Sequence, residues 1–281
     1  SSGDSYTQTG FTTTGTVPAV GNPLGNPPYP GWTSTGGQNW VDYVTTVDNT
    51  SLVLTYNLAS NSQLNGQVRL LTSWAGATIS ADLVAPFDPT VLSLTDQVNQ
   101  FLDSYAAKPS TTPWTSASTL FSVWIGINDI GNSYYLGGDR DAFSDTLLDA
   151  YFALVEKLVR RMVGARNFLF LNVPPVDRSP LMLAQSTSSQ ALEKSVIAGF
   201  NSKLVARAAA LEANYSCVKA WMWDSNAAFT AILDDPTSYG FQDATSYGDG
   251  DGLFWLNNLH PTSYAHAYFG QDVANVLGGF I

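Results

Sequence analysis

Two kinds of apolar pattern alternate along this chain of 281 residues. Short and nearly continuous apolar runs, at 119–129 and 167–175, are typical of strands that are buried on both faces. Long segments at 141–164 and 188–215 have the composition and length of helices. Strands that alternate with long helices predict βαβ units, a parallel sheet and helices on both of its faces.

The rest of the chain fits the same plan. Residues 12–37 are too rich in Pro and Gly for regular structure and predict a long surface loop. A capping-box pattern at Ser93 and Asp96 marks the start of one further helix. We therefore predict a single domain over 1–281, with additional helices at about 38–48, 93–108 and 262–280 and additional strands at 52–59 and 218–224.

Composition excludes several functions. The chain has 12 basic and 23 acidic residues and a net charge of −11, which argues against binding of nucleic acid. No apolar run approaches the length of about 20 residues that a membrane span requires. The single cysteine, Cys217, excludes an internal disulfide, and two histidines without ligand-spaced neighbours predict no metal site. We expect a monomer without a cofactor.

Two N-glycosylation sequons occur, at Asn49 ("NTS") and Asn214 ("NYS"). With few charges and abundant Ser, Thr, Asn and Gly, they predict a secreted, extracellular glycoprotein from a eukaryote.

Four separated motifs carry the residue types that ester cleavage by serine requires. Such cleavage needs a base for the hydroxyl proton, a group that orients the base, and donors for the developing oxyanion. "GDS" presents Ser5 on a turn, "WAGATIS" contains Gly76, "GIND" ends a buried strand with Asn128, and "NNLHPT" supplies His260. In a parallel sheet the loops beyond the strand C-termini lie together, so these motifs can meet.

The four motifs resemble the sequence blocks of the GDSL, or SGNH, hydrolases. The stretches "YPGWTSTGGQNWVDYV", "VWIGINDIGNSY" and "LHPTSYAH" resemble the fungal acetylesterases of carbohydrate esterase family sixteen. This resemblance implies a three-layer α/β/α, flavodoxin-like fold with a central parallel sheet of about five strands.

The resemblance also implies roles for residues. Ser5 would be the nucleophile and His260 the general base, while the backbone N–H groups of Ser5 and Gly76 and the side chain of Asn128 would form the oxyanion hole. The implied reaction is the removal of acetyl groups from short plant-wall saccharides, such as xylo-oligosaccharides, through an acyl-enzyme.

One position departs from the family pattern. Asn257 stands three residues before His260, where the family carries aspartate. In a serine protease the equivalent change lowers turnover by about 10⁴. The enzyme could use a Ser–His dyad with a backbone carbonyl orienting the base, could be an inactivated or binding protein, or could carry Asp where the sequence reads Asn. Asp249 or Asp251 is a further candidate for the missing carboxylate.

The start of the chain departs as well. A nucleophile turn of this type follows a strand of about five to six residues, but only Ser1 and Ser2 precede Gly3. Without that strand, both neighbouring strands would have unpaired backbone groups. We therefore expect that residues upstream of Ser1, or another segment, fill the position. A third departure is the long segment 60–74 before Gly76, which we interpret as an inserted loop.

Aromatic residues are the candidates for contact with sugar. Trp32, Trp40 and Trp255 lie near the loops that flank the expected cleft, and indole rings suit the C–H surfaces of saccharides. We interpret His266 as structural or as part of the rim. Two rival functions are a lipid or aryl esterase, which a large apolar patch beside Ser5 would favour, and a carbohydrate-binding protein that has lost catalysis.

Overall fold

A parallel four-stranded sheet organises the molecule. The computed structural model describes residues 1–59, 63–64, 67–68, 76–86, 88–160 and 162–281. The strands are β1 (Ser2–Gly3), β4 (Leu120–Trp124), β5 (Asn167–Leu171) and β6 (Lys219–Trp223), in the order β1-β4-β5-β6, and a separate antiparallel pair is formed by β2 (Gln63–Leu64) and β3 (Gln67–Val68). The helices are α1 (Trp40–Thr46), α2 (Leu94–Ser104), α3 (Ile127–Gly131), α4 (Arg140–Val159), α5 (Pro180–Leu183), α6 (Thr187–Asn214), α7 (Ser225–Asp234) and α8 (Ser263–Leu277), with 3-10 turns at Val176–Arg178 and Pro236–Tyr239.

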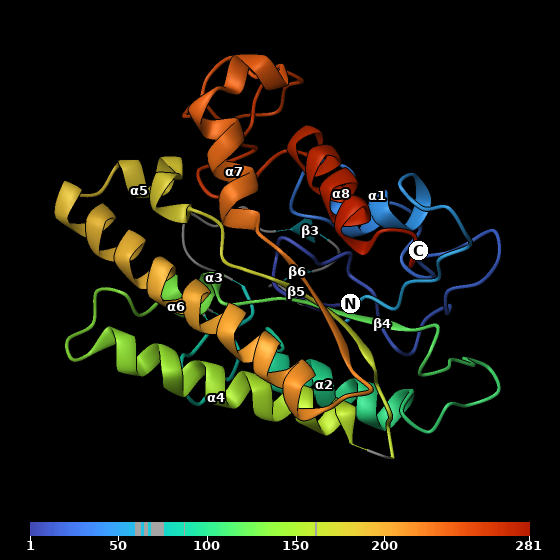
Figure 1. The fold of residues 1–281 in the computed structure, drawn as a ribbon. Coiled ribbons are helices and arrows are strands. Elements are labelled where there is room, and N and C mark those ends of the chain that lie inside the picture. Colours follow the sequence, from blue (N-terminus) through green and yellow to red (C-terminus); the bar gives the residue numbers. More distant parts are fainter. Residues whose placement is uncertain (60–62, 65–66, 69–75, 87, 161) are drawn as a thin grey trace.

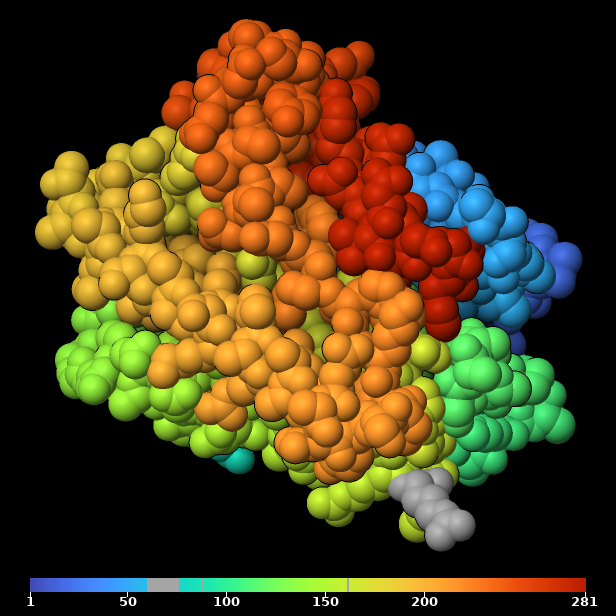
Figure 2. Space-filling model, in the orientation of Figure 1, coloured from blue at the N-terminus to red at the C-terminus, as the bar shows by residue number. Residues whose placement is uncertain are grey.

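Helices cover both faces of the sheet (Figure 1). Helices α2, α4 and α6 lie on one side and α1 and α8 on the other, with β4, β5 and β6 between them. Figure 2 shows one face, across which α6 and α7 run beside α8. The expected α/β architecture with a parallel sheet is confirmed.

The sheet has fewer strands than the family resemblance implied. Residues 52–59 were predicted as a strand. Among the described residues they are hydrogen-bonded to Ser1, the residue before β1, whose amino group donates to the Tyr56 carbonyl at 2.8 Å and whose carbonyl accepts from the Leu58 N–H at 2.8 Å. Two hydrogen bonds to one residue are a parallel bridge but not a ladder. Residues 52–59 therefore lie where a fifth strand would be, but the neighbouring strand β1 is too short to form a ladder with them.

Other differences concern short elements. Helices α3 and α7 begin directly after β4 and β6, inside or next to segments that we predicted as strands. Of the segment 60–74, interpreted as a loop, only the two-residue strands β2 and β3 belong to the described residues. Within the part of the chain that the structure describes, no helix combines the length and apolar character needed to cross a membrane.

Close packing of Gly3 fixes the register between β1 and β4. Gly3 is paired with Trp124, and a Cβ atom added to Gly3 would lie 2.4 Å from the Trp124 carbonyl oxygen. Because that oxygen belongs to the backbone of a buried strand, it cannot move aside without disturbing the ladder. Glycine is therefore the residue that allows β1 to approach β4 at this point.

We expect Gly3→Ala to destabilise the protein by about 1–3 kcal/mol, because the added methyl group forces the two strands apart. Urea unfolding monitored by tryptophan fluorescence measures the change. Gly137→Ala is the matched control, since a Cβ atom there meets nothing within 4 Å. Equal midpoints for the two variants would contradict the role assigned to Gly3.

Candidate active site

Ser5 lies in a tight turn at the carboxyl end of β1. The N–H groups of Thr7 and Gln8 both donate to the Asp4 carbonyl at 3.0 Å, and the Tyr6 N–H donates to Asp4 Oδ1 at 3.0 Å. Ser5 itself is 5% exposed. The turn thus holds the hydroxyl at the edge of the sheet.

Two asparagines that the sequence did not single out hold this turn in place. Asn39 Nδ2 donates to the carbonyls of Thr7 and Gln8, both at 2.9 Å, and Asn57 Nδ2 donates to the Thr7 carbonyl at 2.6 Å. Both asparagines are fully buried. Buried carbonyls need such donors, so the two side chains fix the backbone that follows the nucleophile. Asn39 also caps α1, which is the one sequence signal that could have identified it.

His260 lies on the loop before α8 and faces Ser5. Its Nε2 atom is 2.8 Å from Ser5 Oγ. The loop is tied to its surroundings by the Leu181 N–H, which donates to the Asn258 carbonyl at 2.8 Å, and by the Tyr6 hydroxyl, which donates to the Leu259 carbonyl. Tyr6 therefore connects the turn of Ser5 to the loop of His260.

Asn257 occupies the third position of a hydrogen-bonded chain. Its Oδ1 atom accepts from the backbone N–H groups of Leu259 at 2.9 Å and His260 at 2.8 Å, and lies 3.1 Å from His260 Nδ1. Because a backbone N–H can only donate, the amide atom beside it is the oxygen. The ring nitrogen facing this oxygen must then carry the proton, which leaves Nε2 free to accept from Ser5.

The structure contradicts the dyad in which a backbone carbonyl orients His260, since a side-chain amide oxygen faces Nδ1. Asp251 instead accepts from the Tyr264 hydroxyl at 2.7 Å. Among the described residues no carboxylate is hydrogen-bonded to His260. Burial lowers the pKa of His260 to about 4, so the imidazole is neutral over most of the acidic range.

Gly76 and Asn128 are brought together and are hydrogen-bonded to each other. The Gly76 N–H donates to Asn128 Oδ1 at 3.3 Å, while Asn128 Nδ2 donates to the Ala77 carbonyl at 3.0 Å. The NH₂ group of Asn128 has two hydrogens, so its second N–H can donate to another acceptor. The Gly76 bond is long, so an oxyanion could replace Oδ1 as its acceptor.

Two buried carboxyl groups are neighbours in sequence of the candidate residues, Asp4 before Ser5 and Asp129 after Asn128. Asp4 and Asp129 are both fully buried, and burial raises the pKa of each to about 7. The proximity of Asp129 adds to the rise in the pKa of Asp4. Asp129 accepts from the Ile79 N–H at 3.0 Å, so this carboxyl group anchors the segment that follows Gly76.

The aromatic candidates divide into two groups. Trp40 and Trp255 have exposures of 2% and 0% and pack in the core, so the prediction that they stack on a sugar was wrong. Trp32 is 41% exposed, and its backbone N–H donates at 2.9 Å to the carbonyl of Thr9, four residues after Ser5. His266 is fully buried and its Nδ1 accepts from the backbone N–H of Trp40 at 3.1 Å, which agrees with a structural role.

Comparison with known proteins identifies the family. The model of the GDSL-like lipase/acylhydrolase family matches residues 3–273. The chain belongs to this family. It is also 40% identical over 279 residues to an acetylesterase of Thermothelomyces thermophilus, an alignment that covers 99% of this chain and 87% of that protein. The expected carboxylic ester hydrolase and the likeness to fungal acetylesterases are thereby confirmed.

Buried acids make this hydrolase more stable in acid than at neutral pH. Their pKa values are raised in the folded chain, so it binds more protons than the unfolded chain between about pH 4 and 7. Stability is therefore lost as the pH rises through that window. The groups are Asp4, Asp42 and Asp129, with pKa values of about 7, and Glu193, with a pKa of about 8. Histidines 260 and 266 and the amino terminus have lowered pKa values and act in the opposite direction, but they are fewer.

We expect a higher urea midpoint at pH 5 than at pH 7.5, and we expect Asp42→Asn to reduce the difference because it removes one of the titrating groups. The matched control is Asp103→Asn, at an exposed position on α2. A midpoint that rises from pH 5 to pH 7.5 would contradict the prediction.

Proposed function

We propose that the protein is a serine acetylesterase that removes acetyl groups from short plant-wall saccharides, such as xylo-oligosaccharides, without a cofactor. The observation that carries the proposal is the continuous chain from Ser5 Oγ through His260 to Asn257 Oδ1. The likeness to an acetylesterase over 99% of the chain supports the choice of acyl group.

The first step is acylation. Ser5 Oγ attacks the acetyl carbonyl carbon while its proton passes to His260 Nε2. The carbonyl oxygen becomes an oxyanion. It accepts hydrogen bonds from the backbone N–H of Ser5 and from Asn128 Nδ2. It also accepts from the Gly76 N–H, once that group has exchanged its bond to Asn128 Oδ1 for one to the oxyanion. The tetrahedral intermediate collapses, the C–O bond to the sugar breaks, and His260 returns the proton to the sugar oxygen.

The second step is deacylation. Water attacks the acetyl group on Ser5, and His260 accepts a proton from that water. Collapse of the second intermediate releases acetate, and the proton returns to Ser5 Oγ. The enzyme ends in its starting state.

Asn257 orients the base without stabilising it by charge. In a serine protease the amide substitution is costly because it selects the wrong tautomer. Here the two backbone donors at Oδ1 select the productive tautomer. The remaining cost is the missing negative charge beside the imidazolium. Because the tautomer is the productive one, we propose a working enzyme rather than an inactivated one.

The cavities argue for a short acyl group over a lipid. Two cavities, of about 750 and about 260 Å³, have neither Ser5 nor His260 in their linings. Within the described residues, a long acyl chain on Ser5 would thus have neither of these cavities to enter.

The setting we propose is extracellular. Asn214 lies exposed at the end of α6 and is open to a glycan, whereas Asn49 Nδ2 donates to the carbonyls of Val44 and Thr45. Glycosylation at Asn49 would have to replace part of this capping of α1. We expect one chain to form the whole enzyme as a monomer.

The mechanism is tested by acetate release from 4-nitrophenyl acetate and acetylated xylo-oligosaccharides. We expect Ser5→Ala to lose at least about 10⁴-fold in kcat. We expect Asn257→Leu to lose about 10²–10⁴-fold, because it removes the oxygen that fixes the tautomer. Activity that survives in Ser5→Ala would exclude this mechanism, and an inactive parent protein would favour a binding function.

Asn257→Asp separates charge from geometry. A carboxylate stabilises the imidazolium and raises the pKa of His260, so the acidic limb of kcat/KM moves to higher pH than in the parent, where it falls near pH 4. We expect kcat at pH 8 to rise by about 10- to 100-fold. This gain is smaller than the effect of about 10⁴ on kcat that a wrong tautomer of the histidine has. A gain of about 10⁴ would show instead that the parent holds the wrong tautomer.

Substitutions of Trp32 test whether the protein binds a saccharide substrate through this side chain. We expect Trp32→Ala to raise KM for acetylated xylo-oligosaccharides by about 3- to 30-fold, because stacking on an exposed ring is lost, and to leave kcat/KM for 4-nitrophenyl acetate nearly unchanged. Trp32→Phe, which keeps an aromatic face, should restore most of the affinity. Equal losses on both substrates would mean that Trp32 supports the nucleophile turn instead.

A further inference from the structure

Exposed aromatic side chains gather at one edge of the sheet. Among the described residues they all lie in segments that follow the carboxyl ends of strands, as Ser5 and His260 do: Tyr29, Trp32, Tyr135, Tyr247, Tyr264 and Tyr268. In the described turns at the opposite edge, Tyr105 is buried, and Trp114 and Tyr215 are half-buried. Exposed apolar groups that cluster on one part of a surface mark a contact site, and in parallel sheets ligands bind at the carboxyl edge.

Two of these rings lie on parts of the chain that are bonded to each other. The Ser263 N–H donates to the Thr35 carbonyl at 2.9 Å, and helices α1 and α8 lie side by side (Figure 1). Trp32 stands three residues before Thr35, and Tyr264 stands one residue after Ser263. Their exposed fractions are 41% and 48%. Since His260 stands three residues before Ser263, both rings belong to the surface around the base.

Hydrogen bonds hold two tyrosines of this surface by their hydroxyl groups. The Tyr264 hydroxyl donates to Asp251 Oδ1 at 2.7 Å, and the hydroxyl of the half-buried Tyr43 lies 3.3 Å from Ser263 Oγ. Within the described residues, no aromatic ring packs against Tyr264. Its ring is thus fixed at one end and exposed along its faces, so binding a flat ligand costs little conformational entropy.

The groups beside Tyr264 favour a neutral ligand that is rich in hydroxyl groups. Asp249 and Asp251 are exposed carboxylates on the adjoining loop, and the whole chain has a net charge of −11, so phosphates and acidic lipids are repelled. Aromatic faces suit the C–H surfaces of sugar rings. A carboxylate has several lone pairs, so Asp251 can accept from a sugar hydroxyl as well as from Tyr264.

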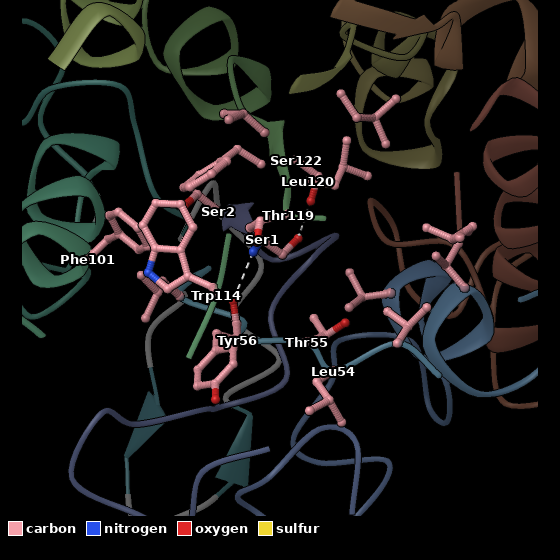
Figure 3. Close-up of a pocket in the computed structure, with 18 of the residues that line it drawn as sticks. Ser1, Ser2, Leu54, Thr55, Tyr56, Phe101, Trp114, Thr119, Leu120 and Ser122 are labelled. Atoms are coloured by element: carbon pink, nitrogen blue, oxygen red, sulfur yellow. Dashed lines mark hydrogen bonds between the residues drawn. The ribbon is translucent and has the colours of Figure 1, made fainter. Parts of the chain in front are cut away.

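The larger cavity lies toward the other edge of the sheet. Figure 3 shows this cavity of about 750 Å³, whose lining includes Trp114 and Thr119. Both residues precede β4 and therefore lie at its amino end, whereas Ser5 follows the carboxyl end of β1. A saccharide whose ester reaches Ser5 therefore extends over the open carboxyl edge, where Trp32 and Tyr264 are exposed.

We propose that Tyr264 and Asp251 form an accessory subsite for the backbone of a neutral oligosaccharide, a role that rests on the saccharide substrate of the proposed function. Tyr264 stacks on a sugar ring beyond those that contact Trp32, and Asp251 accepts a hydrogen bond from a hydroxyl of that ring. Affinity for the saccharide then increases with its length.

Binding of a saccharide without an ester tests the subsite apart from catalysis. Titrations with unsubstituted xylohexaose and xylobiose, followed by NMR, measure the two Kd values. We expect Tyr264→Ala to raise the Kd for xylohexaose by about 3- to 20-fold, because stacking is lost, and to change the Kd for xylobiose by less than about 2-fold. Tyr264→Phe, which keeps the ring, should retain most of the affinity. Tyr215→Ala is the matched control, since it removes a ring at the opposite edge.

The dependence of turnover on chain length provides a second readout. The ratio of kcat/KM for acetylated xylohexaose to kcat/KM for acetylated xylobiose should fall by about 3- to 20-fold in Tyr264→Ala. A ratio equal to that of the parent, or a Kd for xylohexaose that Tyr264→Ala leaves unchanged, would overturn the proposal. So would a loss of the same size in Tyr215→Ala.

Two further outcomes separate the subsite from other functions. A parent that sediments as a dimer, and that Tyr264→Ala dissociates, would assign the surface to a second copy of the chain and overturn the proposal. A parent that binds xylohexaose through Tyr264 but releases no acetate would support the subsite and contradict the proposed esterase. The failure of one proposal is therefore distinguishable from the failure of the other.

Discussion

The contact between Gly3 and the Trp124 carbonyl sets the geometry on which the site depends. It aligns β1 with β4, so that the nucleophile turn and the turn after β4 leave the sheet side by side. Ser5 stands two residues beyond this contact on one strand, and Asn128 stands four residues beyond it on the other. A slip of one residue would turn the side chains of β1 to the opposite face and separate the Ser5 hydroxyl from the Asn128 side chain.

The sequence predicts the long elements because their signals are local. Buried strands with runs such as "FLFL" and helices with capping residues depend mostly on near neighbours, and they occur close to where we expected them. Helix α3 was missed because it continues the apolar run of β4, whereas α7 follows its N-cap Asp224, a local signal that our prediction did not use. At such junctions, the packing of the folded chain decides where the strand ends.

The site is only partly readable from the sequence. Ser5, Gly76, Asn128 and His260 were found because their motifs are short and contiguous. Asn39, Asn57 and Gln97 act through bonds to backbone groups more than 30 residues away, and the one local pattern among them, the cap of α1, points only to Asn39. Trp40 and Trp255 were misjudged for a related reason, since proximity to a loop in sequence does not show whether an indole ring points inward.

Asn257 and His260 belong to one short loop, and the contacts between them include the backbone of that loop. His260 and Asn257 are therefore held together by the backbone of that loop. Tyr6, which follows Ser5, joins the loop to the turn of Ser5. A displacement of the whole loop would then change the separation of Ser5 Oγ and His260 Nε2, but it would leave intact the hydrogen bonds that set the protonation pattern of the imidazole.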